Sequence, residues 1–245
     1  RKYLSGFHAF WSMGTLAAAF FGSFLIGRVS YSIHLAGIAV IVFSVLIVTS
    51  RALEDKKPGG IEAKPVDMKW NTPMGRIVIL MGVGMMFSNA AEFGATDWSA
   101  LFLRDVLEIT GQLYVGAYLT FELGMIISRI LGDKYIHKYG AGKVIQFSGF
   151  LGASVWLTSM VIGVNIDHFN KPLAYVVILI GYFVAGAGVG PLFPGFITLL
   201  GSTPGIDMGT ALSRAFLIAM VGVAIIPASI GFVSDATSLT IGMLI

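Results

Sequence analysis

Residues 122–143 read ELGMIISRILGDKYIHKYGAGK and are the most informative stretch of the chain about its fold class. An apolar helix that includes Glu122 and Arg129 leads directly into Gly-Asp-Lys, where we expect a tight turn and then a basic loop. A soluble core helix rarely ends in this way. In a membrane protein the pattern indicates a buried polar pathway followed by the exit of the helix from the bilayer. The stretch therefore favours a membrane-embedded helix bundle.

The rest of the chain has the composition of a membrane protein. It is 56% hydrophobic and 12% charged, and its apolar residues form blocks of roughly the 20 residues that cross a bilayer core. A soluble helical protein would instead need charged outer faces on its helices. The expected fold is an all-α polytopic bundle with seven full transmembrane helices and the start of an eighth at residue 237. The seven segments lie near 7–27, 33–50, 75–95, 113–131, 144–164, 173–199 and 209–232.

The positive charges predict the orientation of these helices. When the connecting loops alternate between two sides, Arg28, Arg104 and Lys171 fall on one side and the other 13 of the 16 Lys and Arg residues fall on the opposite side. The positive-inside rule makes the second side cytoplasmic, and it includes the polar segment 51–73. The net charge of +3 thus reports topology and does not indicate a nucleic-acid partner.

The sequence offers little to support catalysis. It contains no cysteine and only four scattered histidines, so no metal-ligand spacing is visible. We find no nucleophile–base pair and no phosphate-binding loop. The Gly-Ala-Gly sequence at 140–142 follows no strand and is not a dinucleotide fingerprint. We therefore expect neither an enzyme nor a cofactor or metal site.

One segment divides the chain. Residues 51–73 combine acidic and basic groups with prolines and glycines, which is the composition of a linker. The expected organisation is a two-helix piece at 1–50, a cytoplasmic loop at 51–73 and a larger helix bundle at 74–245. Pro73 suits the first turn of the helix that follows the loop. The chain begins with Arg1 and stops within an apolar run, so we interpret it as part of a longer protein.

Small residues predict close helix packing. Gly14, Ala18 and Gly22 recur every four residues, and a second ladder at this spacing runs from Gly116 to Gly132. Such spacing places small residues on one helical face and lets helix backbones approach closely in lipid. The stretch 188–194 contains two prolines and should bend or break its helix.

Polar groups inside apolar spans mark the candidate site, because each charge there costs several kcal/mol. Glu92, with Asn89 three residues before it, and Glu122 are candidate carboxylates that bind a solute or protons in a central cavity. A structural carboxylate, hydrogen-bonded to a neighbouring helix or paired with a cation, is the alternative. Tyr118 belongs to a set of aromatic residues that could stack on a ligand or fill the core. Arg129 is expected near the membrane boundary, either snorkelling or paired with Asp133.

Several motifs resemble the major facilitator superfamily. Residues 129–140, RILGDKYIHKYG, resemble the family's Gly-x-x-x-Asp-Arg/Lys-x-Gly-Arg/Lys loop in its C-terminal-half copy. Residues 7–14, 92–103 and 186–194 resemble a sugar-transporter-like bacterial branch. Ile136 departs from the pattern, since the loop usually has a glycine there.

The resemblance implies a twelve-helix plan in which the loop at 51–73 joins two six-helix halves. The helices before it resemble helices five and six, and those after it resemble seven to eleven with twelve just begun. The implied function is alternating access around a midplane site, in a bacterial inner membrane, for a small solute, with or without coupling to protons. Sugars are the solute class that the branch resemblance suggests. A membrane receptor that keeps the fold without transport is the alternative.

The resemblance also implies a gate at the end of the fourth helix. We name the residues expected to form it the gate segment: Arg129, Gly132, Asp133, Lys134 and Lys138. The loop aspartate of such proteins faces the cytoplasmic end of a helix from the opposite half. Asp133 is therefore expected close to residues 5–8, where a helix N-terminus favours an anion.

Overall fold

The computed structural model describes residues 4–25, 27–51 and 69–244, and within these residues the secondary structure is entirely helical. The expected all-α architecture is therefore confirmed. Residues 52–68, most of the expected central loop, lie outside the described residues. The helices are α1 (Leu4–Leu25), α2 (Tyr31–Ser50), α3 (Pro73–Asp105), the short 3₁₀ helix η1 (Gly111–Val115), α4 (Gly116–Tyr139), α5 (Ala141–Asp167), α6 (Lys171–Val189), α7 (Leu192–Ser202), α8 (Met208–Ala236) and α9 (Leu239–Gly242).

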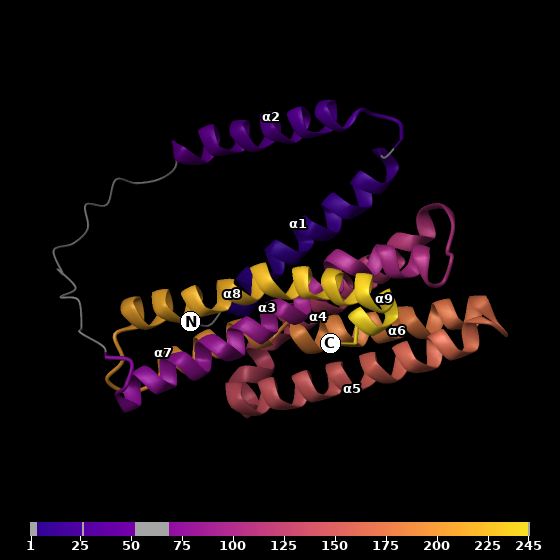
Figure 1. The fold of residues 1–245 in the computed structure, drawn as a ribbon. Coiled ribbons are helices and arrows are strands. Elements are labelled where there is room, and N and C mark those ends of the chain that lie inside the picture. Colours follow the sequence, from indigo (N-terminus) through magenta and orange to yellow (C-terminus); the bar gives the residue numbers. More distant parts are fainter. Residues whose placement is uncertain (1–3, 26, 52–68, 245) are drawn as a thin grey trace.

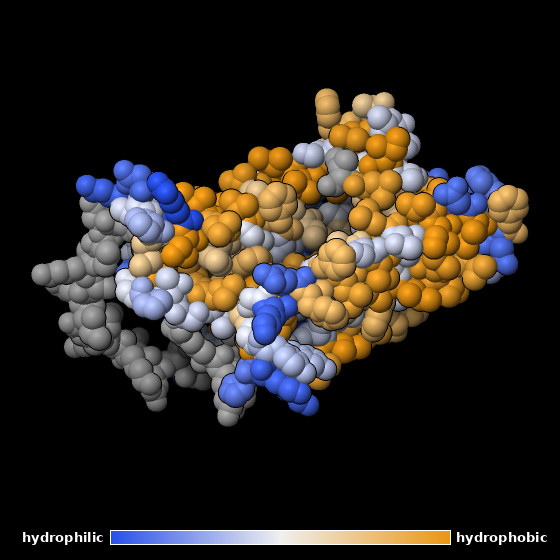
Figure 2. All heavy atoms as spheres, turned by 90° about the horizontal axis from the view of Figure 1, so that it is seen from below, coloured by the Kyte–Doolittle hydropathy of each residue, from blue (hydrophilic) through white to orange (hydrophobic). Residues whose placement is uncertain are grey.

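The described helices make this a multi-pass membrane protein. Six helical segments are long and apolar enough to cross a bilayer, whereas the sequence predicted seven and the start of an eighth. The 22-residue α1 is not among the six. The expected eighth span is represented by the four residues of α9. Figure 2 shows a broad hydrophobic surface, with hydrophilic side chains gathered toward both ends of the view and in a further group between them.

Helices α3 to α8 form the bundle, and the two N-terminal helices, α1 and α2, differ in how they contact it (Figure 1). Helix α1 packs along α4, while α2 stands away from the bundle and has no buried residue. Buried side chains form two hydrophobic clusters. The larger, which includes Phe121 and Tyr182, joins α3, α4, α5, α6, α8 and α9. The smaller, which includes Val78 and Met85, joins α3, α7 and α8.

The helix ends follow local chemistry. Thr72 caps α3 by accepting a hydrogen bond from Gly75 N at 3.1 Å, and Pro73 occupies the first turn as predicted. Gly140 ends α4 with a φ of 85°, a conformation that favours glycine. The predicted turn at Gly-Asp-Lys is wrong, because α4 continues as a regular helix through residues 132–139. No proline interrupts that stretch, and the first residue with a left-handed φ is Gly140.

The ladder in α4 is where two backbones meet. A Cβ added to Gly124 would lie 2.1 Å from the carbonyl oxygen of Phe183, and one added to Gly186 would lie 2.0 Å from that of Phe121. These contacts confirm close packing of α4 on α6. The ladder in α1 behaves differently. Among the described residues, nothing lies within 4 Å of a Cβ added to Gly14.

The predicted helix break is confirmed between α6 and α7. Helix α6 ends at Val189 and α7 begins at Leu192, with Gly190 and Pro191 between them. In a continuous helix the Gly190 carbonyl would accept a hydrogen bond from the N–H of residue 194, but Pro194 has none. The break therefore leaves the Gly190 carbonyl oxygen in need of another donor.

Candidate functional site

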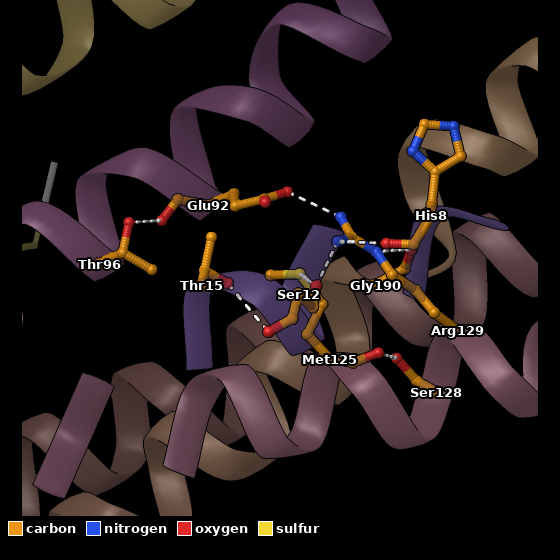
Figure 3. Close-up of polar contacts among 9 residues, drawn as sticks. All are labelled: His8, Ser12, Thr15, Glu92, Thr96, Met125, Ser128, Arg129 and Gly190. Atoms are coloured by element: carbon orange, nitrogen blue, oxygen red, sulfur yellow. Dashed lines mark hydrogen bonds and ion pairs between the residues drawn. The ribbon is translucent and has the colours of Figure 1, made fainter. Parts of the chain in front are cut away.

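A buried ion pair joins α3 to α4. Arg129 Nη2 lies 2.9 Å from Glu92 Oε2, and the two side chains are 3% and 9% exposed (Figure 3). Along α3, Glu92 stands between Met85 of the smaller hydrophobic cluster and Ala95 of the larger one. The pair therefore occupies the junction between the two apolar cores.

Arg129 also binds two further elements. Its Nη1 donates to Ser12 Oγ and, at 3.5 Å, to the carbonyl oxygen of His8, both on α1. Its Nε donates to the Gly190 carbonyl oxygen at 3.3 Å, which is the acceptor that Pro194 leaves without a backbone donor. The expectation that Arg129 snorkels toward the membrane surface is therefore wrong. The guanidinium has donors in a fixed fork, and this site uses that fork on α1, α3 and the α6–α7 break.

Glu122 lies two turns before Arg129 on α4 and is 2% exposed. Among the described residues, its Oε2 has no hydrogen-bond partner. The carboxylate lies near the hydroxyls of Thr15 and Ser12 and interacts electrostatically with Glu92 and Arg129. A buried acceptor of this kind is costly when ionised, so the arrangement suits a group that takes up a proton.

Tyr118 and Asn89 are the other two candidate site residues. Tyr118 is half-buried, one turn before Glu122, and its hydroxyl lies near Thr15 and Glu122. Asn89 is 7% exposed and precedes Glu92 by about one turn of α3. The structure thus gathers the ion pair, Glu122 and Tyr118 into one polar cluster. Their role in transport stays a prediction.

The gate segment lies on the last turns of α4 and not in a loop. Asp133 Oδ2 accepts a hydrogen bond from Gly6 N at 3.0 Å. The expected proximity of Asp133 to residues 5–8 is therefore found, at the start of α1, where the helix dipole favours a carboxylate. Gly132 is buried, whereas Lys134 and Lys138 are exposed.

Sequence reasoning missed three partners of the cluster. Ser12 bonds Arg129 and also donates to Met125 Sδ at 3.1 Å, and Thr15 donates to the Ser12 carbonyl oxygen at 3.0 Å. A hydroxyl in an apolar helix is common, and nothing in the local sequence shows which helix it faces. The Gly190 carbonyl did carry a signal, since a proline four residues later always removes its helical donor.

Helices of this length, an apolar surface and a buried charge cluster define a membrane-embedded helical bundle. Residues 1–239 match the sequence profile of the Major Facilitator Superfamily, so the chain belongs to this family. No solved structure matches the chain.

Curated relatives agree with this assignment. The chain is 22% identical to an uncharacterised transporter of Sinorhizobium fredii and 23% identical to an uncharacterised MFS-type transporter of Yersinia pestis. Each match covers 98% of this chain and 60% or 59% of the relative. The cis,cis-muconate transport protein of Acinetobacter baylyi is 25% identical over 68% of this chain and 38% of its own length. The chain thus spans about 60% of the length of the first two relatives.

Proposed function

We propose that the complete gene product transports a small solute across the bacterial inner membrane by alternating access. The observation that carries the proposal is the buried cluster of Arg129, Glu92 and Glu122 at the meeting of α1, α3, α4 and the α6–α7 break. Charges are kept inside a membrane protein at a cost, and they mark substrate or ion pathways. Family membership and relatives named as transporters support the same function.

The charge of the cluster supports proton coupling. With both carboxylates ionised, two negative charges face the one positive charge of Arg129, which leaves a net charge of −1. Uptake of one proton by Glu122 makes the cluster neutral, and its release restores the charge. The change between inward-facing and outward-facing states costs the protein less free energy when the cluster is neutral than when it is charged.

The second part of the proposal concerns the gate. In the family plan α1 belongs to the N-terminal half and α4 to the C-terminal half, with the 51–73 loop cytoplasmic between them. On this plan α1 also crosses the membrane, which brings the number of spans to seven, and α9 begins an eighth. The hydrogen bond from Gly6 N to Asp133 then ties the two halves at the cytoplasmic side, and its loss lets that side open.

The solute is proposed to be a small organic molecule. Sugars are the class indicated by the branch resemblance, and one relative is named a cis,cis-muconate transport protein. Uptake is measured into proteoliposomes of the complete gene product, with and without an inward proton gradient. Sugars are tested as one class of solute and cis,cis-muconate as the other. A protein that moves neither class nor any other small solute under either condition would be a receptor-like member of the fold.

Replacing Glu122 by glutamine is expected to remove the pH dependence of uptake. The amide keeps the shape of the side chain but cannot bind and release a proton, while Glu92, Arg129 and Tyr118 around it remain. Initial uptake rates from pH 5 to pH 8 measure the effect. Glu108→Gln is the matched control, because this carboxylate is exposed and lies outside the cluster. Identical pH profiles for Glu122→Gln and wild type would contradict the proton role.

Replacing Asp133 by asparagine is expected to favour separation of α1 from the end of α4. An anion at a helix N-terminus contributes about 0.3–1 kcal/mol, so the ratio of the closed to the open state should fall by up to about fivefold. The chain has no cysteine, which permits spin labels at Phe10→Cys and Lys134→Cys. Pulsed electron–electron distance measurements should show a longer component in Asp133→Asn and none in the control Asp235→Asn. An unchanged distance distribution would remove the proposed gate.

A further inference from the structure

A cavity lies on the outer face of the bundle. It has a volume of about 670 Å³ and runs between α4, α5 and α6. Its walls are apolar, with Leu131 from α4, Phe147 and Leu151 from α5 and Ala187 from α6. Leu131 is 41% exposed and Phe147 is 70% exposed, whereas Arg129 on the same helix is 3% exposed. The cavity is therefore a groove that opens toward the surroundings of the bundle; we call it the α4–α6 groove.

One end of the α4–α6 groove is polar and basic. Lys143 lines it together with Tyr135 and Tyr139, whose rings stack with centroids 6.3 Å apart. Lys138 Nζ lies 4.9 Å from the centroid of the Tyr139 ring. Figure 2 shows hydrophilic side chains around the α4–α5 turn next to hydrophobic ones. The groove thus has an apolar body and a cationic mouth.

The charge at this mouth is uncompensated in sequence. From residue 130 to residue 166 the chain has three lysines, and Asp133, its one acid, bonds the start of α1. The adjoining N-terminus of α5 adds partial positive charge, and its N-cap Gly140 offers no side-chain acceptor to the first turn. An anion at the mouth would meet lysine ammonium groups and backbone N–H groups together.

We propose that the α4–α6 groove binds an anionic glycerophospholipid of the surrounding membrane, with an acyl chain along the apolar walls and the headgroup phosphate at Lys143. A phospholipid is the occupant that combines a long apolar chain with an anion at one end. Tyrosines at the height of the headgroups suit such an interface. Basic pockets between transmembrane helices bind anionic headgroups by the same charge complementarity.

Native mass spectrometry of the purified chain tests the proposal. The detergent-solubilised protein is incubated with phosphatidylglycerol or with phosphatidylcholine of the same acyl chains. Wild type is expected to retain more phosphatidylglycerol. Lys143→Gln should reduce that retention about fivefold, the effect of one lysine near an anionic lipid surface, and leave phosphatidylcholine retention unchanged. Ala187→Phe, which fills the apolar body, should reduce retention of both lipids.

Lys69→Gln is the matched control, because this lysine is exposed and distant from the α4–α6 groove along the chain. Circular dichroism of each variant verifies its helix content. Equal retention of the two lipids by wild type, or equal losses in Lys143→Gln and Lys69→Gln, would overturn the proposal. A mass of two chains in place of lipid adducts would assign the groove to a second copy of the protein.

Discussion

Arg129→Met is expected to lower the free energy of unfolding by about 3–5 kcal/mol, the cost of removing one partner from a buried ion pair. The substitution keeps an unbranched side chain but removes the guanidinium, which leaves the Glu92 carboxylate without its cation. It also removes the donor to the Gly190 carbonyl oxygen. Denaturation of the purified protein in mixed micelles measures the change, and uptake by the complete gene product should fall to background.

Two comparisons sharpen the Arg129 experiment. Arg104→Met is the matched control, because its ion pair with Asp105 is exposed, and it should unfold at the wild-type denaturant concentration. The double variant Glu92→Gln with Arg129→Met removes both charges and should recover part of the lost stability. If the pair serves transport, the double variant folds but does not transport; a double variant that transports normally would make the pair purely structural. Wild-type stability of Arg129→Met would contradict the ion pair itself.

Gly186→Ala is expected to destabilise the protein by about 3 kcal/mol, at the upper end of overpacking effects. The added Cβ would lie 2.0 Å from the Phe121 carbonyl oxygen and 2.8 Å from the carbonyl carbon. These are backbone atoms, so relief requires that α4 and α6 move apart. Such a movement would open the cluster around Phe121 and Tyr182, both of which are almost fully buried. The loss is measurable as a lower thermal unfolding temperature and reduced recovery of monodisperse protein.

Gly14→Ala provides the matched control with the opposite sign. Among the described residues nothing lies within 4 Å of the added Cβ, and alanine is favoured over glycine in a helix by about 1 kcal/mol. This variant should be as stable as wild type or more stable. If the two alanine variants unfold at the same temperature, the close approach of α4 and α6 is not made in the protein.

Much of the fold was readable from the sequence, because membrane helices must satisfy their own backbone hydrogen bonds. Apolar blocks therefore predicted helices, and prolines predicted the break before α7. The start of α3 at Pro73 follows from the same local chemistry. The error at Gly132–Lys134 has a local cause too. Three polar or small residues suggested a turn, but α4 ends where a left-handed backbone is required, at Gly140.

The candidate site was only half readable. The cost of burying charge singled out Glu92, Glu122 and Arg129, but it did not show which way each side chain points. Arg129 lies one turn from Asp133 in sequence, and its ion pair with Glu92 joins residues 37 positions apart. Whether Arg129 reaches Glu92 depends on how α3 and α4 are placed relative to each other. The partners Ser12 and Gly190 depend in the same way on the positions of α1 and the α6–α7 break.

The missing amide hydrogen of Pro194 has a mechanical consequence. The Gly190 carbonyl oxygen accepts its hydrogen bond from Arg129. Any movement that withdraws the guanidinium therefore leaves this oxygen without a donor in a region with little water. The α6–α7 break and α4 are therefore expected to move together as one block. The same guanidinium reaches α1 by other donors, and we expect those bonds to break while the one to Gly190 persists. Arg129 is thus expected to hold α4 and the α6–α7 break together throughout the movement and to bind α1 reversibly.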